Sequence, residues 1–424
     1  MSEFILPQFQ HLKREYDAAV RCNRCGFCET VCPTYTATGK ETLSPRGRNQ
    51  AFRNILEGKL EDAAAARDIF STCLTCHACT NVCFAQVPVV RIMGAARKIS
   101  QTPLQNALAR AAFRALLFNR RALSVVLWLA FLLKRTLIPR VLRLAGVLKL
   151  ISRPLAAAED LVEEAPLSFG ACPPKNSNVK GNADVALFSG CGVHYLFPGA
   201  SQAIVDNLDA RNTAIRCPRH SCCGLIPQSA GDVKTARELA EKNIRDFGSL
   251  RVKTVLASDD SCAGFMKSYP ALLPDNPDAG SFAAKVKNLS EFLVALPPVA
   301  PRPGASAPPV KVTYHDPCQM GNGHKSFSSP RQILKNLPGV QYVELEEANE
   351  CCGGAGTYSL KHPELADEVL EKKLQNIEKS GAEVVVTQAA SCLLHIAYGS
   401  RKKKWSGKIR VVHLAEFLSE RGST

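Results

Sequence analysis

Two runs of four closely spaced cysteines constrain this chain more than any other feature. In each run the cysteines follow one another at steps of three, three and four residues, in Cys22–Cys32 and again in Cys73–Cys83. A cubane iron–sulfur cluster takes thiolates from such tightly spaced runs, and the fourth cysteine of a run ligates the other cluster when two are present. The spacing therefore predicts two [4Fe–4S] clusters with crossed ligation. The expected ligands are Cys22, Cys25, Cys28 and Cys83 for cluster 1, and Cys73, Cys76, Cys79 and Cys32 for cluster 2.

Zinc and disulfides are the alternatives to clusters. Sets of four cysteines also bind zinc, but zinc sites usually separate two C-x-x-C pairs by a longer loop. Pro33 follows Cys32, whereas Phe84 follows Cys83, a departure that leaves the ligand spacing intact. The chain has 18 cysteines in 424 residues and no signal-peptide pattern at its start. This combination favours metal ligation in a reducing cytoplasm over a disulfide scaffold.

The positive charge of the chain is concentrated in one segment. Of a net charge of +15, residues 91–153 contribute thirteen Lys or Arg and no Asp or Glu. The remainder is close to neutral, so the charge does not indicate a nucleic-acid-binding protein. The apolar run 122–133 is shorter than the roughly 20 residues that span a bilayer. This basic, amphipathic segment predicts a docking surface, either for an anionic membrane or for a partner subunit.

The C-terminal half repeats one pattern of short β-rich runs and helical stretches. Each copy has a strand that ends on a cysteine, a Cys-Cys-Gly turn, a helix, and a strand that runs into another cysteine. The two copies follow each other at a nearly constant offset along the chain. Alternating strands and helices predict a parallel sheet, and ligands gather at the carboxyl ends of its strands. The candidate metal ligands are Cys191, Cys222, Cys223 and Cys262 in repeat 1, and Cys318, Cys351, Cys352 and Cys392 in repeat 2.

The metal content of the repeats is open at this point. Adjacent cysteines can reach two metal atoms from one turn, and the glycine after them allows close backbone approach. One or two further iron–sulfur clusters are expected, with zinc, an empty site or structural cysteines as alternatives. Cys217 has no counterpart in repeat 2, which indicates a structural role, and the isolated Cys172 is expected to be a free thiol.

Three stretches carry a family resemblance: 24–35 (RCGFCETVCPTY), 45–48 (PRGR) and 351–358 (CCGGAGTY). The N-terminal half resembles two-cluster bacterial-ferredoxin-type domains, and the C-terminal half resembles a tandem of the cysteine-rich CCG domain. Together, over residues 15–100 and 184–420, they are similar to the iron–sulfur subunit of glycolate oxidase and related D-lactate dehydrogenases. The chain is also similar to the lactate-utilisation iron–sulfur protein, to the third subunit of anaerobic glycerol-3-phosphate dehydrogenase, and to heterodisulfide reductase subunits with fused domains.

The resemblance implies an α+β fold: an α-helical ferredoxin-like two-cluster domain, a basic helical segment and two α/β CCG modules. The expected parts are the two-cluster domain 1–100, the basic segment 101–155, a linker 156–182, repeat 1 at 183–296, a Pro-rich linker 297–309, and repeat 2 at 310–424.

The implied function is electron transfer within a flavin-dependent 2-hydroxy-acid dehydrogenase, acting on glycolate or lactate. A strand followed by G-x-G-x-x-G is not found, so substrate oxidation is expected on a partner FAD-binding subunit, and no catalytic residue is assigned here. Electrons would pass to a quinone or cytochrome. The expected location is cytoplasmic and peripheral at the inner face of the cell membrane.

One departure separates the chain from the heterodisulfide reductases. Their CCG motifs end in C-x-x-C, which gives five cysteines for a noncubane cluster. Here Phe265 and His395 replace the last cysteine, which favours four-ligand electron-transfer clusters. Disulfide chemistry, a glycerol-3-phosphate dehydrogenase role and a zinc-containing redox sensor or scaffold remain the alternatives. His395 is either a replacement ligand or a hydrogen-bonded core histidine.

Overall fold

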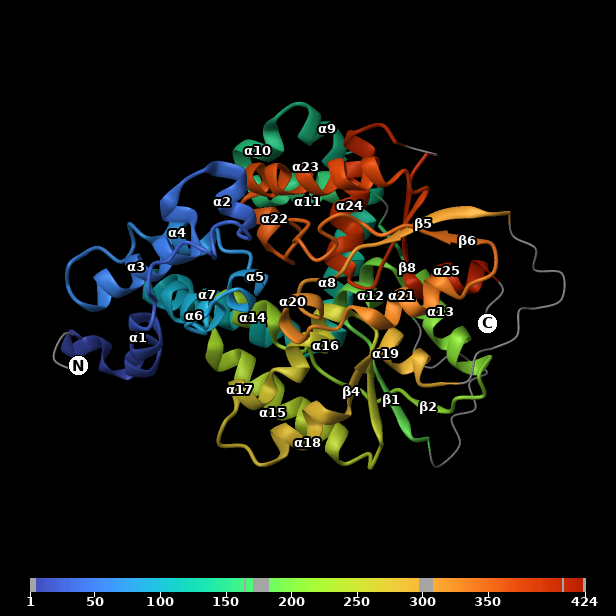
Figure 1. The fold of residues 1–424 in the computed structure, drawn as a ribbon, viewed down its shortest axis with the longest axis horizontal. Coiled ribbons are helices and arrows are strands. Elements are labelled where there is room, and N and C mark those ends of the chain that lie inside the picture. The colour runs from blue at the N-terminus through green and yellow to red at the C-terminus, as the bar shows by residue number, and fades with distance from the viewer. Residues whose placement is uncertain are drawn as a thin grey trace.

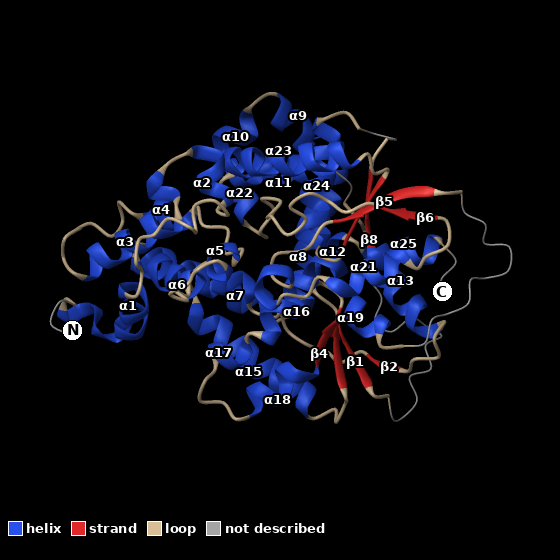
Figure 2. Cartoon of the chain, viewed as in Figure 1, coloured by secondary structure: helices blue, strands red, loops and turns tan. Residues whose placement is uncertain are grey.

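The computed structural model describes residues 5–136, 138–163, 165–170, 183–296, 308–405 and 408–421. The expected fold class is confirmed, because a helical N-terminal part precedes two four-stranded parallel sheets covered by helices. In Figure 1 the N-terminal part (blue) lies at the left, and the two sheet modules lie one above the other at the right. Figure 2 shows strands only in these two modules among the residues it describes. Cys172 and most of the Pro-rich linker lie outside the described residues.

The N-terminal part is built from short helices that alternate with the cysteine loops. Helix α3 begins at Pro45 because the Ser44 side chain accepts a hydrogen bond from the Gly47 amide at 3.0 Å. Its buried face packs with α1 and α6 around Phe52 and Ile92. The elements are η1 (Pro7–Leu12), α1 (Lys13–Val20), α2 (Pro33–Thr38), η2 (Glu41–Leu43), α3 (Pro45–Leu56), α4 (Arg67–Ser71), α5 (Ala78–Asn81) and α6 (Val89–Ile99).

The basic segment is helical and extends further than the sequence predicts. Ser152 caps its last helix, which runs to Leu161, so the prediction of a linker was wrong for residues 156–161. The physical reason is packing, because Ala156 and Leu161 are buried and this helix contacts α22 and α24 of repeat 2. The helices are α7 (Pro103–Leu117), α8 (Arg120–Arg135), α9 (Ile138–Leu144), α10 (Val147–Ile151) and α11 (Arg153–Leu161).

Both repeats have the same topology. The strand order is β2-β1-β3-β4 in repeat 1 and β6-β5-β7-β8 in repeat 2, and all pairs are parallel. Repeat 1 consists of β1 (Val185–Phe188), α12 (Cys191–Leu196), α13 (Pro198–Asp209), β2 (Ile215–Arg216), α14 (Leu225–Ser229), α15 (Val233–Gly248), β3 (Thr254–Ala257), α16 (Asp260–Lys267), α17 (Tyr269–Leu272), α18 (Asp278–Lys285), β4 (Val286–Asn288) and α19 (Leu289–Val294). Repeat 2 consists of β5 (Val310–Tyr314), α20 (Gly321–His324), α21 (Ser328–Lys335), β6 (Val340–Tyr342), α22 (Tyr358–Lys361), α23 (Pro363–Ser380), β7 (Val384–Thr387), α24 (Ala390–Lys402), β8 (Arg410–His413) and α25 (Leu414–Glu420).

The two repeats pack on each other through several helices and a shared core. Helix α13 of repeat 1 packs on α25, and α19 packs on α21. One buried apolar cluster contains residues from both sheets. The carboxyl ends of β3 and β7 meet, because Asp259 Oδ2 accepts a hydrogen bond from the Ala390 amide at 2.9 Å and the Asp260 amide donates to the Gln388 carbonyl at 3.0 Å. The cysteine-bearing edges of both sheets therefore lie at the joint between the repeats.

Candidate metal centres

The structure brings Cys83 to the first cysteine run. Cys22, Cys28 and Cys83 pack against the core of the N-terminal part, and Cys25 is exposed. The ring of Phe27 lies 5.3 Å from that of Phe84 in an edge-to-face arrangement, which holds the two loops together. Phe27 is 55% exposed and Phe84 is 81% exposed. This group of cysteines, the cluster 1 group, therefore lies at the molecular surface.

The guanidinium of Arg46 supports the loop of the cluster 1 group. It donates hydrogen bonds to the Arg24 carbonyl at 3.2 Å and to Glu41 at 2.8 Å. Gly26 adopts φ +87°, and a side chain there would meet the Arg46 guanidinium at 3.0 Å. The tight curl between Cys25 and Cys28 therefore depends on glycine.

The other four cysteines of the N-terminal part line one pocket. Cys32, from the first run, lies in it with Cys73, Cys76 and Cys79. Burial, and next the neighbouring thiols of Cys318 and Cys79, raise the pKa of Cys76 well above its usual value. Cys32 thus joins the second run in this pocket, as crossed ligation requires. We call this set the cluster 2 group.

Two buried arginines flank the cluster 2 group. Arg48 is 1% exposed, donates to the Ile69 carbonyl at 2.8 Å and directs Nη1 at Cys32 Sγ, 3.9 Å away. Arg97 is 7% exposed and donates to the backbone carbonyls of Cys73 and Ser229. Within the described ranges, no carboxylate forms an ion pair with either guanidinium. Because buried charges need a counter-charge, the pocket fits an anionic group such as a cluster held by four thiolates.

In repeat 1 the four thiols form a continuous chain of contacts. Cys191 is hydrogen-bonded with Cys222, Cys222 with Cys223, and Cys223 with Cys262. Hydrogen bonding with Cys222, followed by burial, raises the pKa of Cys191 well above its usual value. Arg120 of the basic segment donates to the Ser189 carbonyl beside this group at 3.1 Å. Since coordination deprotonates a thiol outright, these buried thiols fit a metal better than they fit free thiolates.

Repeat 2 reproduces the same chain of thiols. Cys318 is hydrogen-bonded with Cys351, Cys351 with Cys352, and Cys352 with Cys392. Hydrogen bonds with Cys351 and then Cys392 hold the pKa of Cys352 well below its usual value. We call the two thiol sets the repeat-1 centre and the repeat-2 centre.

The glycine of each Cys-Cys-Gly turn is structurally required. Gly224 adopts φ +100° and Gly353 adopts φ +82°. A Cβ at Gly224 would lie 3.1 Å from the Ala236 carbonyl oxygen, and one at Gly353 would lie 2.6 Å from the Ala366 carbonyl oxygen. Both glycines thus provide a left-handed backbone and a close approach to the following helix, as expected from the sequence.

Two histidines adjoin the repeat-2 centre in different ways. His395 Nδ1 donates to the Cys352 carbonyl at 2.7 Å, and its ring stacks on Tyr398. His315 is 1% exposed, and neither of its ring nitrogens has an oxygen or nitrogen hydrogen-bond partner among the described residues. One ring nitrogen of His315 and the sulfurs of Cys352 and Cys392 lie within 4.8 Å of one another. Sequence reasoning considered His395 and missed His315, which a residue-by-residue superposition of the two repeats would have marked.

The cluster 2 group and the repeat-2 centre share a buried interface. Asn322 donates to the Cys76 carbonyl at 3.2 Å, and Gln319 donates to the Thr75 carbonyl at 3.1 Å. Tyr358, from the motif that follows Cys352, is buried in one apolar cluster with Cys76 and Cys351. The two cysteine sets are therefore neighbours in space, although the whole basic segment and repeat 1 separate them along the chain.

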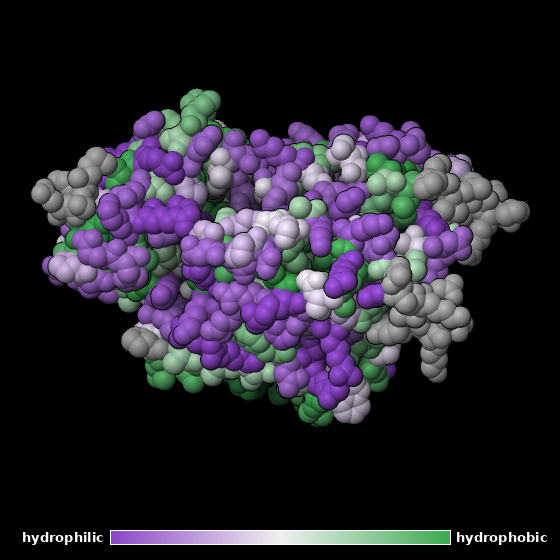
Figure 3. Space-filling view, turned by 90° about the horizontal axis from the view of Figure 1, so that it is seen from below, coloured by the Kyte–Doolittle hydropathy of each residue, from purple (hydrophilic) through white to green (hydrophobic). Residues whose placement is uncertain are grey.

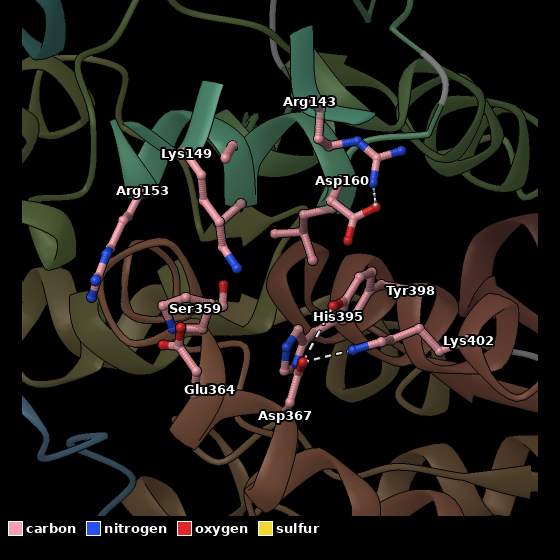
Figure 4. A pocket seen from close by; sticks show the side chains of 14 residues that line it. Arg143, Lys149, Arg153, Asp160, Ser359, Glu364, Asp367, His395, Tyr398 and Lys402 are labelled. Carbon is pink, nitrogen blue, oxygen red and sulfur yellow. Dashed lines mark hydrogen bonds and ion pairs between the residues drawn. The ribbon is translucent and has the colours of Figure 1, made fainter. Parts of the chain in front are cut away.

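A pocket of about 370 Å³ opens beside the repeat-2 centre, between the basic segment and repeat 2. Figure 4 shows Lys149 pointing from the basic segment into the pocket, Arg153 at one edge of it, and Arg143 turned toward Asp160, to which it is hydrogen-bonded. The pocket therefore offers both cationic and aromatic groups next to the residue that supports Cys352. Its other charged lining residues are Asp160, Glu364, Asp367 and Lys402.

The basic segment presents apolar side chains to solvent. Within the described chain, no single helix is long and apolar enough to cross a membrane, and α7 with α8 passes that test only as a pair bent by 98°. Figure 3 shows a mostly hydrophilic face with hydrophobic residues gathered along its lower edge. The exposed apolar residues of α8 are Val125, Val126, Trp128, Leu129, Leu132 and Leu133.

Comparisons with known proteins agree with this division. A 4Fe-4S dicluster domain matches residues 18–87, and the CCG cysteine-rich domain matches 185–267 and 312–397. A probable glycolate oxidase iron–sulfur subunit of Bacillus subtilis (strain 168) is 31% identical over 417 residues, which covers 95% of this chain and 93% of that protein. The glycolate oxidase iron–sulfur subunit of Escherichia coli (strain K12) is 26% identical, with 91% and 92% covered. Lactate utilization protein A of Exiguobacterium sp. is 34% identical over 56% of this chain and 97% of its own length.

Combined cysteine variants test the crossed grouping. We expect Cys73→Ala with Cys76→Ala to remove about four iron atoms per chain. Adding Cys32→Ala should change nothing further, because Cys32 lies in the same pocket, whereas adding Cys22→Ala should remove about four more. The measurement is iron and acid-labile sulfide per chain after anaerobic purification. A further loss of iron on adding Cys32→Ala would show that Cys32 serves the first group instead.

Proposed function

Since this chain belongs to the family of glycolate oxidase iron–sulfur subunits, we propose that it is the electron-transfer subunit of a flavin-dependent 2-hydroxy-acid dehydrogenase. Its substrate would be glycolate or lactate, oxidised on a partner FAD-binding subunit. The observation that carries this proposal is the spatial order of the cysteine sets. They run from the exposed Cys25, through the buried pocket around Cys32 and Cys76, to the repeat-2 centre.

The residues of the chain support electron transfer without themselves catalysing a reaction. Iron–sulfur clusters, when bound, take up and release single electrons at potentials set by ligands, charge and solvent exposure. Arg48 and Arg97 place positive charge beside the inner pocket, and Tyr358 packs with Cys76 and Cys351 in one buried apolar cluster. We propose that the N-terminal cysteine sets hold two [4Fe–4S] clusters and the repeats hold one or two more.

The two ends of this series of cysteine sets, the exposed cluster 1 group and the buried repeat-2 centre, suit different partners. The cluster 1 group is accessible at Cys25 and is bordered by the exposed rings of Phe27 and Phe84, which suits a partner flavoprotein. The pocket beside His395 gives a small acceptor, such as a quinone, access to the repeat-2 centre. A cytochrome is the alternative acceptor, and it would need to reach the same end of the molecule.

Disulfide chemistry at the repeats is the second candidate function. It would use a fifth cysteine in each repeat, and the side chains at those positions are Phe265 and His395. Phe265 packs edge-to-face on Tyr269 in the core of repeat 1, and His395 is hydrogen-bonded to the Cys352 carbonyl. Neither position offers a sulfur ligand, so the geometry favours electron transfer.

Anaerobic affinity purification of the full chain from its own host tests the proposal. We expect an FAD-containing protein to copurify, and glycolate or D-lactate to bleach the visible absorption of the clusters in that complex. The matched control is the same chain stripped of its partner, in which neither hydroxy acid should cause bleaching. Bleaching that no hydroxy acid causes, or a thiol-trapped paramagnetic signal after addition of a disulfide, would contradict the proposal.

We further propose that the basic segment holds the protein at an anionic membrane surface, on the cytoplasmic side. Exposed cations, including Arg121, Arg140 and Lys149, border the exposed apolar side chains of α8 to α10. An amphipathic surface of this kind lies in the membrane interface, with its cations at lipid phosphates.

Surface variants of α8 test the membrane proposal. We expect Val125→Gln combined with Leu129→Gln and Leu132→Gln to weaken binding to anionic phospholipid vesicles at least about tenfold, because apolar area is lost from the interface. Iron content should not change, since these side chains are exposed. Phe84→Gln, at the cluster 1 group, is the matched control and should bind as the unmodified chain does. Equal cosedimentation of the α8 variant and the control would contradict the proposal.

A further inference from the structure

The two repeats carry the same four cysteines but different neighbours. His315 precedes Cys318 by the same number of positions as Phe188 precedes Cys191. His395 likewise follows Cys392 at the same distance in sequence as Phe265 follows Cys262. Each imidazole near the repeat-2 centre thus has a phenyl ring as its counterpart in repeat 1.

The phenylalanines of repeat 1 act as core residues. Phe188 is 1% exposed, and its ring lies 4.2 Å from that of His220 and 5.7 Å from that of Phe247. Phe265 packs on Tyr269. Neither ring offers a metal ligand, so these two positions add no donor to the thiols of the repeat-1 centre.

His315 occupies the position equivalent to Phe188 but carries a polar ring. It follows β5 directly, it is 1% exposed, and both its ring nitrogens lack an oxygen or nitrogen partner among the described residues. Buried polar groups are hydrogen-bonded with few exceptions, and the interaction found for the His315 side chain is with the Cys352 thiol. One of its nitrogens lies close to the sulfurs of Cys352 and Cys392, within 4.8 Å. The imidazole and the thiols therefore point to a common ligand.

His395 does not compete for this role. Its Nδ1–H donates a hydrogen bond to the Cys352 carbonyl. Its ring stacks on that of Tyr398, with a centroid distance of 5.8 Å and an interplanar angle of 11°. A hydrogen bond of this kind positions the backbone of a ligand, as outer-shell partners of metal sites do. His395 is therefore a positioning residue, and His315 is the additional donor.

We propose that the repeat-2 centre is a mixed thiolate–imidazole metal site in which His315 ligates iron together with cysteines of the set Cys318, Cys351, Cys352 and Cys392. The repeat-1 centre is a thiolate-only site. This inference rests on the proposed function, which supplies the identity of the metal. Sulfur and imidazole donors suit iron and zinc and disfavour magnesium or calcium.

The mixed donor set has a consequence for electron transfer. Where the His315 imidazole takes the place of one of the four thiolates, it would remove negative charge from the cluster and raise its reduction potential. The repeat-2 centre, which adjoins the cluster 2 group on one side and the pocket beside His395 on the other, would then be the electron acceptor of the series. The repeat-1 centre, with thiolates alone, would have the lower potential of the two repeats.

Pulsed EPR on the reduced holoprotein tests this assignment directly. The signal of the repeat-2 centre is first identified by its loss in Cys392→Ala. We expect it to show a strong nitrogen hyperfine coupling that changes when the protein is labelled with ¹⁵N-histidine, a readout that needs no variant. His315→Phe, which installs the residue of repeat 1, should abolish the coupling, whereas His395→Gln should retain it.

The outcomes separate this inference from the proposed function. Absence of the coupling in the unmodified protein, or its persistence in His315→Phe, overturns the histidine ligation even if glycolate or D-lactate still reduces the complex. Zinc in place of iron at the repeat-2 centre also overturns it. Absence of iron and sulfide from the whole chain contradicts the proposed function itself.

Discussion

The buried positive charge of Arg48 and Arg97 is the constraint on which the N-terminal half depends. Both guanidinium groups lie in the interior beside Cys32 and Cys73, and no carboxylate of the described chain neutralises them. Such charges persist in a folded protein only against a counter-charge. An anionic cluster in the pocket of Cys32, Cys73, Cys76 and Cys79 would provide it, and the folding of this half would then be coupled to metal binding.

The repeat-2 centre lies next to this pocket. The two repeats share topology, glycine turns and a chain of four thiols, yet it is repeat 2 that joins the pocket, through Asn322 and Tyr358. Repeat 2 also has His315 where repeat 1 has Phe188. Repeat 2 is thus the repeat whose cysteines share a buried cluster with Cys76, and it is the one with a histidine beside its thiols. Repeat 1 packs against repeat 2 through Asp259, which accepts a hydrogen bond from the Ala390 amide, and through the shared apolar core.

Local signals predicted much of this architecture, and tertiary packing decided the rest. The helix expected after the Cys-Cys-Gly turn of repeat 2 is found in α23, which Pro363 begins and Gly381, with φ +63°, ends. Cysteine spacing likewise predicted that Cys32 belongs with the second run, and the structure has it in one pocket with Cys73, Cys76 and Cys79. The extension of α11 to Leu161 was not predictable, because it depends on contacts with repeat 2. The burial of Arg48 and Arg97 and the surroundings of His315 also arise only from residues distant in sequence.

A redox titration of Arg48→Gln tests the central claim most directly. Removing a positive charge beside Cys32 should make the potential of one N-terminal cluster more negative, on the order of tens of millivolts, and leave the other unchanged. Arg48→Lys should shift it less, and Arg53→Gln, on the same helix but paired with Glu57, should leave both potentials unchanged. Equal potentials in Arg48→Gln and the unmodified protein would show that this guanidinium does not face an anionic cluster.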